Sequence, residues 1–144
     1  MPLPPTDQPP KGFDEQLAAA YAAADYRVNA FTLHIGRPHP AFDAWLLQQG
    51  RTRYTLLTAF NPKSKVLTAE ENRVRHETLV QLLRFRQYAY VDAVSTDPGG
   101  HWPDEEGVCL FDLPEGEARA LGRIYEQHAL VEGSTGGTPL LHWL

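Results

Sequence analysis

The sequence predicts an α+β domain in which helices cover a mixed β-sheet. Segments with apolar residues at helical spacing alternate along the chain with segments of strand-like apolar pattern. Two of the strand-like segments, 88–97 and 107–113, are separated only by a loop, which favours an antiparallel pair. A chain of 144 residues is long enough for one hydrophobic core and too short for two. A doubly wound α/β fold is the alternative, because the two classes differ in how the crossover helices are placed.

The N-terminal half predicts two helices and two strands that follow a proline-rich tail. Residues 1–12 contain five prolines and are expected to be disordered, outside a single domain that spans 13–144. Alanine-rich sequence predicts the first helix, and a terminal glycine marks the end of the second. The predicted helices cover 13–24 and 41–50, and the predicted strands cover 26–35 and 53–60.

The clearest boundary in the second half is the start of a long helix at Ala69. Thr68 and Glu71 stand in the T-x-x-E arrangement of a capping box, which marks the residue before a helix. A further helix is predicted at 114–127, because Pro114 is typical of a first helical turn. The remaining predicted strands are 88–97, 107–113, 128–132 and 138–144.

Polar side chains gather where the strand at 53–60 meets the long helix. The strand is interrupted at Asn61, which precedes a proline and is therefore expected in a turn. At about 100° per residue, Arg75 falls near the middle of the apolar face of the helix and Asn72 toward one side of it. That face is expected to consist of Val74, Leu79, Leu82, Leu83 and Phe85.

An inward-facing Arg75 needs an acceptor, since an unpaired buried charge costs several kcal/mol. One interpretation is an internal salt bridge to Glu71 or to the acidic run 104–106, with Asn61 and Asn72 pinning the loop. The other is an anion brought by a ligand, which the free N–H groups at a helix N-terminus would favour. Both interpretations remain open at the level of the sequence.

A second candidate set lies in the loop between the strands at 88–97 and 107–113. His101 and Trp102 precede the acidic run that contains Glu105. An imidazole and a carboxylate beside an aromatic ring could position a proton donor, with His101 or Glu105 exchanging the proton. The alternative is a solvated loop whose Trp102 fills a gap in the core.

These motifs resemble those of the bacterial domain-of-unknown-function family 3293. The resemblance rests on TAFNPKS at 58–64 and EENRVR at 70–75, which are similar to the family's T-A-W-N-P and E-N-x-x-R patterns. It continues in DPGGHWPDEEGVCLF at 97–111 and YEQHALV at 125–131. The chain departs from the family pattern at Phe60, where tryptophan is usual. The resemblance implies which residues matter and implies no activity.

Composition excludes several classes of function. The formal net charge of −5 argues against the basic surface that nucleic-acid binding needs. The one cysteine, Cys109, excludes an intrachain disulfide and is expected to be a buried core residue. Six scattered histidines show no metal-binding spacing, and the glycine-rich segment 132–139 is no phosphate loop, so neither a metal nor a cofactor is expected.

The sequence leaves two functional hypotheses. The first is a small domain that binds an anionic metabolite, such as a nucleotide, in a crevice formed by the junction and the Trp102 loop, with acid–base chemistry as an option. The second is a protein-interaction module in which the same residues are structural and exposed aromatics such as Trp143 or Tyr88 meet a partner. With no secretory signal and no membrane-spanning apolar run, a cytoplasmic location is expected. Oligomeric state is not predicted.

Overall fold

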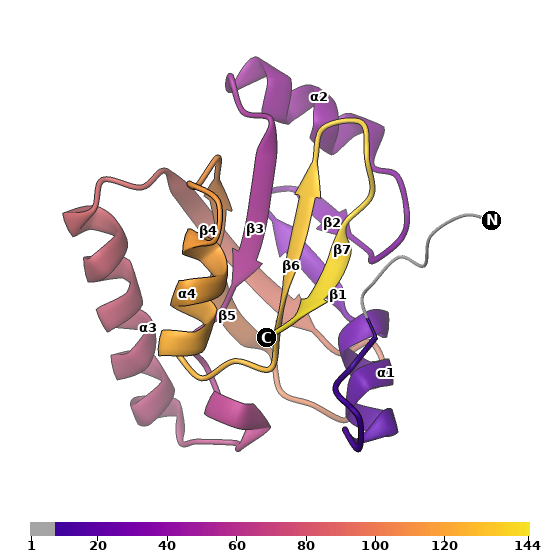
Figure 1. Cartoon of the computed structure of the whole chain (residues 1–144), viewed down its shortest axis with the longest axis vertical. Coiled ribbons are helices and arrows are strands. Elements are labelled where there is room, and N and C mark those ends of the chain that lie inside the picture. Colours follow the sequence, from indigo (N-terminus) through magenta and orange to yellow (C-terminus); the bar gives the residue numbers. More distant parts are fainter. Residues whose placement is uncertain (1–7) are drawn as a thin grey trace.

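One curved β-sheet carries helices on both of its faces (Figure 1). A computed structural model describes residues 8–144. The helices are α1 (Glu15–Ala23), α2 (Pro40–Gln48), α3 (Ala69–Phe85) and α4 (Glu117–Ile124), with a short 3₁₀ helix at Pro62–Ser64. The strands are β1 (Asp25–Val28), β2 (Phe31–Leu33), β3 (Arg53–Leu57), β4 (Tyr90–Thr96), β5 (Glu105–Phe111), β6 (Ala129–Ser134) and β7 (Leu140–Trp143). The α+β class is confirmed.

The seven strands lie in the order β2-β1-β4-β5-β3-β6-β7. Every neighbouring pair is antiparallel, including the expected pair β4–β5. The crossover through α3 joins β3 to β4, and β5 lies between these two strands, so the crossover produces no parallel pair. The sheet over residues 8–144 is therefore antiparallel rather than mixed, and the doubly wound alternative is wrong.

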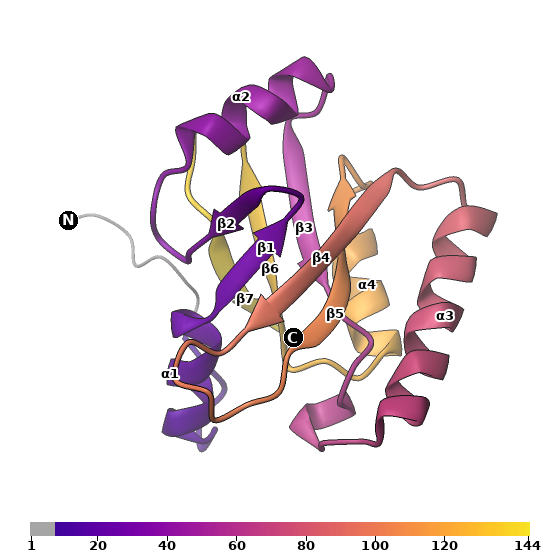
Figure 2. The ribbon, with the colours of Figure 1, turned by 180° about the vertical axis from the view of Figure 1, so that it is seen from behind.

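Alternation of side chains across the sheet creates two hydrophobic cores. On β5, Cys109 and Phe111 face one core, while Val108 and Leu110 face the other. The first core is covered by α1 and α2, and the second by α3 and α4 (Figure 2). Cys109 is buried as expected, and this burial raises the pKa of its thiol, which makes the thiol unreactive.

The predicted strand at 26–35 is instead a β-hairpin. Val28 pairs with Phe31, so Asn29 and Ala30 form a two-residue turn between β1 and β2. Asn29 has φ of 52°, in the left-handed region that asparagine tolerates better than most residues. The alternation of apolar residues continues through the turn, so the sequence pattern predicted one strand and not a hairpin.

The capping box at the start of α3 is confirmed, and the expected apolar face of this helix is partly wrong. Thr68 Oγ1 accepts from the backbone N–H of Glu71 at 3.1 Å, and Glu71 Oε1 accepts from that of Thr68 at 3.2 Å. Leu79 is fully buried, but Val74 is 46% exposed and Phe85 is 86% exposed. At 3.6 residues per turn these two side chains point roughly 120–140° away from Leu79, toward solvent.

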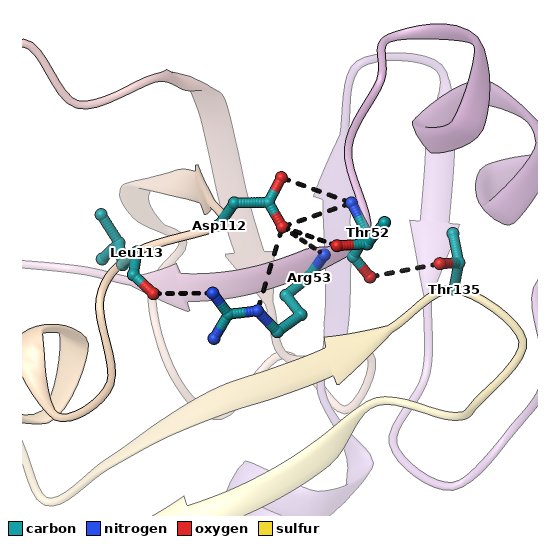
Figure 3. Close-up of polar contacts among 5 residues, drawn as sticks. All are labelled: Thr52, Arg53, Asp112, Leu113 and Thr135. Atoms are coloured by element: carbon teal, nitrogen blue, oxygen red, sulfur yellow. Dashed lines mark hydrogen bonds and ion pairs between the residues drawn. The ribbon is translucent and has the colours of Figure 1, made fainter.

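Asp112, which follows β5, forms hydrogen bonds to the residues at the start of β3 (Figure 3). Its Oδ1 accepts from the backbone N–H of Arg53 at 2.8 Å and from Thr52 Oγ1 at 2.9 Å. Burial opposes ionisation of Asp112, but these hydrogen bonds outweigh it and lower the pKa of the carboxyl. Thr135 joins the cluster by donating its hydroxyl to the Thr52 carbonyl at 3.2 Å. The candidate site lies at the opposite end of β3 and β5.

The chain before α1 lies partly outside the described residues. Of the tail expected at 1–12, residues 1–7 fall outside the description, and the Pro10 carbonyl accepts from the Phe13 N–H at 3.0 Å in a turn that leads into α1. The Phe13 ring packs edge-on against Trp143, 4.8 Å between centroids. No helix within residues 8–144 has the length and apolar character needed to cross a membrane.

Candidate functional site

A cavity of about 110 Å³ lies between α1 and the sheet face that carries Cys109. One stripe of α1 forms a wall of the cavity, because its lining residues recur at i, i+3, i+4 and i+7. These residues are Leu17, Ala20, Tyr21 and Ala24. The segment that joins β4 to β5 passes beside α1 and closes a second side (Figure 2). The lining is predominantly apolar, as in most small-molecule sites.

Glu105 is the polar group that stands out in this apolar lining. It is the first residue of β5, and alternation along that strand places it on the same sheet face as Cys109. Burial raises the pKa of the Glu105 carboxyl, and a hydrogen bond from Asn61 opposes the rise without cancelling it. Asn61 Nδ2 donates to Glu105 Oε2 at 2.8 Å. The cavity therefore contains the Glu105 carboxyl, which is held by the neutral side chain of Asn61 and is harder to ionise than a carboxyl in water.

Asn61 is held by hydrogen bonds of both its backbone and its side-chain amide. Its backbone N–H donates to Asn72 Oδ1 at 2.9 Å, and Asn72 Nδ2 donates back to Asn61 Oδ1 at 2.8 Å. The backbone N–H of Leu67 donates to the same Oδ1 at 2.9 Å. Asn61 has φ of 48°, and Lys63 and Ser64 also lie in the left-handed region. Three such residues in four form a strained turn that persists only because its surroundings hold it.

Arg75 and Gln127 hold this turn from the side of α3 and α4. Arg75 Nε donates to the Ala59 carbonyl and Arg75 Nη2 to the Tyr125 carbonyl, each at 2.6 Å. Gln127 is buried, and its Nε2 donates to the Phe60 carbonyl at 2.9 Å and to the Tyr125 carbonyl at 3.2 Å. The half-buried guanidinium therefore meets backbone carbonyls, whereas the sequence suggested a carboxylate or a ligand anion. These contacts bind the end of β3 to the turn after α4.

The structure brings three of the six candidate residues together at the cavity. Asn61, Trp102 and Glu105 line it, and the Trp102 side chain is 40% exposed at its edge. Asn72 and Arg75 stand behind Asn61 and do not belong to the lining.

His101 lies outside the cavity lining. Its side chain is 83% exposed, and its Nδ1 lies 3.8 Å from Asp97 Oδ2. The imidazole that the sequence paired with the acidic run therefore faces solvent on the loop. By contrast, the aromatic residues suggested as a partner surface are not exposed. Trp143 is buried, and Tyr88 is half-buried against the core under α3 and α4.

Sequence reasoning missed the hydroxyl groups that share the cavity with Glu105. The hydroxyl groups of Tyr21 and Ser64 form a hydrogen bond of 3.0 Å. The Tyr26 hydroxyl donates to the Tyr21 carbonyl at 2.7 Å. No spacing in the sequence relates Tyr21 to Ser64, which lies 43 residues further along the chain.

The site offers no cluster suited to a metal ion. Within residues 8–144, no group of three or more His, Cys, Asp or Glu side chains is arranged to hold one. The chemistry that the site can supply is thus that of a desolvated carboxyl, hydroxyl groups and an apolar chamber.

Comparison with known proteins yields one family. The model of a family described as "Protein of unknown function (DUF3293)" matches residues 57–130, just over half of the chain. No curated protein and no solved structure matches. The matched segment contains Asn61, Asn72, Arg75 and Glu105, and it ends before β7 and begins after α1.

Proposed function

Because the chain belongs to the DUF3293 family of proteins of unknown function, we propose its function from the site itself: it binds a small, largely apolar molecule in the cavity beneath α1. Glu105 is the polar group that this molecule meets. The observation that carries the proposal is a carboxyl placed at an apolar cavity and held there by one neutral amide. Burying such a group without an ionic partner is unfavourable for the fold alone, and this pattern is typical of ligand sites.

An anionic metabolite fits this cavity less well than an apolar molecule. Among the described residues that line it there is no lysine, arginine or histidine. The cation expected to hold an anion, Arg75, has its Nε and Nη2 donors on backbone carbonyls. In the proposed function Asn61, Trp102 and Glu105 contact the ligand, while Asn72 and Arg75 position Asn61. We place this activity in the cytoplasm, which a lone free thiol such as Cys109 favours.

Acid–base catalysis at Glu105 is the second candidate function. A carboxyl whose pKa is raised by burial holds a proton more readily than a solvated one and is better suited to transfer it. His101 takes no part in this candidate function, because it lies outside the cavity lining. Binding comes first in either case, so one experiment serves both.

The proposed binding is tested by filling the cavity from α1. Ala20 lines the cavity, whereas its neighbour Ala19 is exposed and does not, so Ala20→Leu and Ala19→Leu form a matched pair. A thermal-shift and NMR screen of small apolar probes with one polar group should find compounds that stabilise the wild type and Ala19→Leu. We expect Ala20→Leu to bind the same compounds at least tenfold more weakly, because its side chain occupies the chamber.

Two results would count against the proposed binding. The first is a screen in which no probe stabilises the wild type. The second is equal binding by Ala20→Leu and Ala19→Leu, which would place the ligand elsewhere on the surface.

A further inference from the structure

The cavity contains negative charge without a compensating positive charge. Its lining residues include the acids Asp97 and Glu105, and none of the described lining residues is a lysine, arginine or histidine. Asp97 accepts hydrogen bonds from the backbone N–H groups of Gly99, His101 and Trp102, and these bonds lower the pKa of its carboxyl, so it is ionised at neutral pH. The formal charge of the whole chain, −5, has the same sign.

The lining also contains hydroxyl groups, which can accept hydrogen bonds. Tyr21 and Ser64 both line the cavity, and their hydroxyl oxygens lie 3.0 Å apart. Ser95 lies directly across the ladder from Glu105, on the same sheet face, and lines the cavity as well. A ligand that donates several hydrogen bonds from one atom would use these acceptors together with the carboxyl of Glu105.

The ring of Trp102 adds a surface that attracts cations. Trp102 lines the cavity close in sequence to Glu105, and the indole face interacts favourably with ammonium groups. Tyr21 and Tyr26 contribute two further rings to the lining, and Glu105 is near enough to both phenols to interact with them electrostatically. Carboxyl groups, hydroxyl oxygens and aromatic rings together are complementary to a positively charged donor.

We infer that the ligand of this cavity is an amine, with its apolar body in the chamber and its ammonium group on the Glu105 carboxylate. This inference rests on the proposed function and specifies the ligand's chemical class. An ammonium group carries three donors and no acceptor, which matches a lining with carboxyl and hydroxyl acceptors. It also supplies the opposite charge that the half-buried Glu105 carboxylate lacks. A carboxylate ligand would instead meet like charge, and an alcohol would gain a neutral hydrogen bond only.

Isosteric probes test this inference: hexylamine, hexanol and hexanoate differ only in the polar group. Calorimetric titration at pH 7.5 should show hexylamine binding the wild type at least tenfold more tightly than hexanol. This factor corresponds to about 1.4 kcal/mol, the difference between a charged and a neutral hydrogen bond. Glu105→Gln should reduce the preference to less than threefold, while Glu106→Gln, at an exposed neighbouring position, should retain it.

The outcomes separate the inference from the proposed function beneath it. If hexanol binds as tightly as hexylamine, the cavity binds ligands but the amine is the wrong class. If hexanoate binds most tightly, the ligand is an anion, as the first hypothesis from the sequence proposed, and the amine inference is wrong. If none of the three compounds binds, the proposed function itself fails. Equal hexylamine preference in Glu105→Gln and the wild type would place the ammonium group away from Glu105 and overturn the inference.

Discussion

Replacing Arg75 by methionine should lower the free energy of unfolding by about 3 kcal/mol, since two charge-assisted hydrogen bonds are lost at once. Methionine keeps the length and apolar stem of the side chain, so the change isolates the guanidinium. The carbonyls of Ala59 and Tyr125 would each lose the bond from Arg75 at 2.6 Å, and the Tyr125 carbonyl would keep only the longer bond from Gln127 at 3.2 Å. Urea denaturation of the wild type and the variant measures the difference.

The control for this prediction is Arg84→Met on the same helix. Arg84 is exposed near the end of α3, so its replacement should change stability by less than about 0.5 kcal/mol. If both variants lose the same small amount, Arg75 does not hold the junction, and its guanidinium would be free for another purpose.

Replacing Asn72 by leucine should cost about 2–3 kcal/mol of stability and weaken ligand binding as well. Leucine has a similar volume, but it leaves the Asn61 backbone N–H without its acceptor and the Asn61 Oδ1 with the Leu67 N–H as its remaining donor. Asn61 would then be held less firmly in its left-handed conformation, and its amide would no longer be aimed at Glu105. Urea denaturation gives the stability change, and titration with hexylamine gives the effect on binding.

Gln81→Leu is the matched control for Asn72→Leu, because Gln81 is exposed on the same helix. We expect the control to retain both stability and hexylamine binding. A stable Asn72→Leu variant with unchanged binding would show that the paired asparagines are dispensable, and the link from α3 to the cavity would be lost.

The residues by which the sequence resembled its family thus form a supporting chain that ends at the cavity. Glu71 caps the start of α3, and Asn72 and Arg75 hold the turn after β3. Asn61, which lies in this turn, donates its side-chain N–H to the Glu105 carboxyl. The family match covers all of these residues, whereas α1, which forms the apolar wall, lies outside it. The polar end of the site therefore belongs to the matched segment, and the apolar wall does not.

The features that local rules control were predictable from the sequence. The spacing of Thr68 and Glu71 was enough to predict the start of α3. The loop between β4 and β5 was enough to predict that these two strands pair antiparallel. The hairpin at Asn29 was missed, because one asparagine in a left-handed conformation reverses the chain without interrupting apolar alternation.

The partners of Arg75 and the cavity itself were not predictable, for a different reason. A side chain that donates to backbone carbonyls leaves no trace in the sequence, since every residue has a carbonyl. The cavity combines α1 with loops more than 40 residues away, as in the contact of Tyr21 with Ser64. Such tertiary contacts depend on the placement of whole elements.

The most direct test of this account is a ¹³C NMR titration of the Glu105 carboxyl in the wild type and in Asn61→Gly. Glycine tolerates the left-handed backbone at position 61 and removes the amide that favours the charged carboxylate. Glu105 should titrate above the usual glutamate pKa in the wild type and higher still in the variant. Because the folded-state pKa is raised, the contribution of Glu105 to stability is full at low pH and is lost as the pH rises through that value. A Glu105 that titrates near the ordinary value, about 4.3, in both proteins would contradict the account, because its carboxyl would then lie in water and not in the cavity.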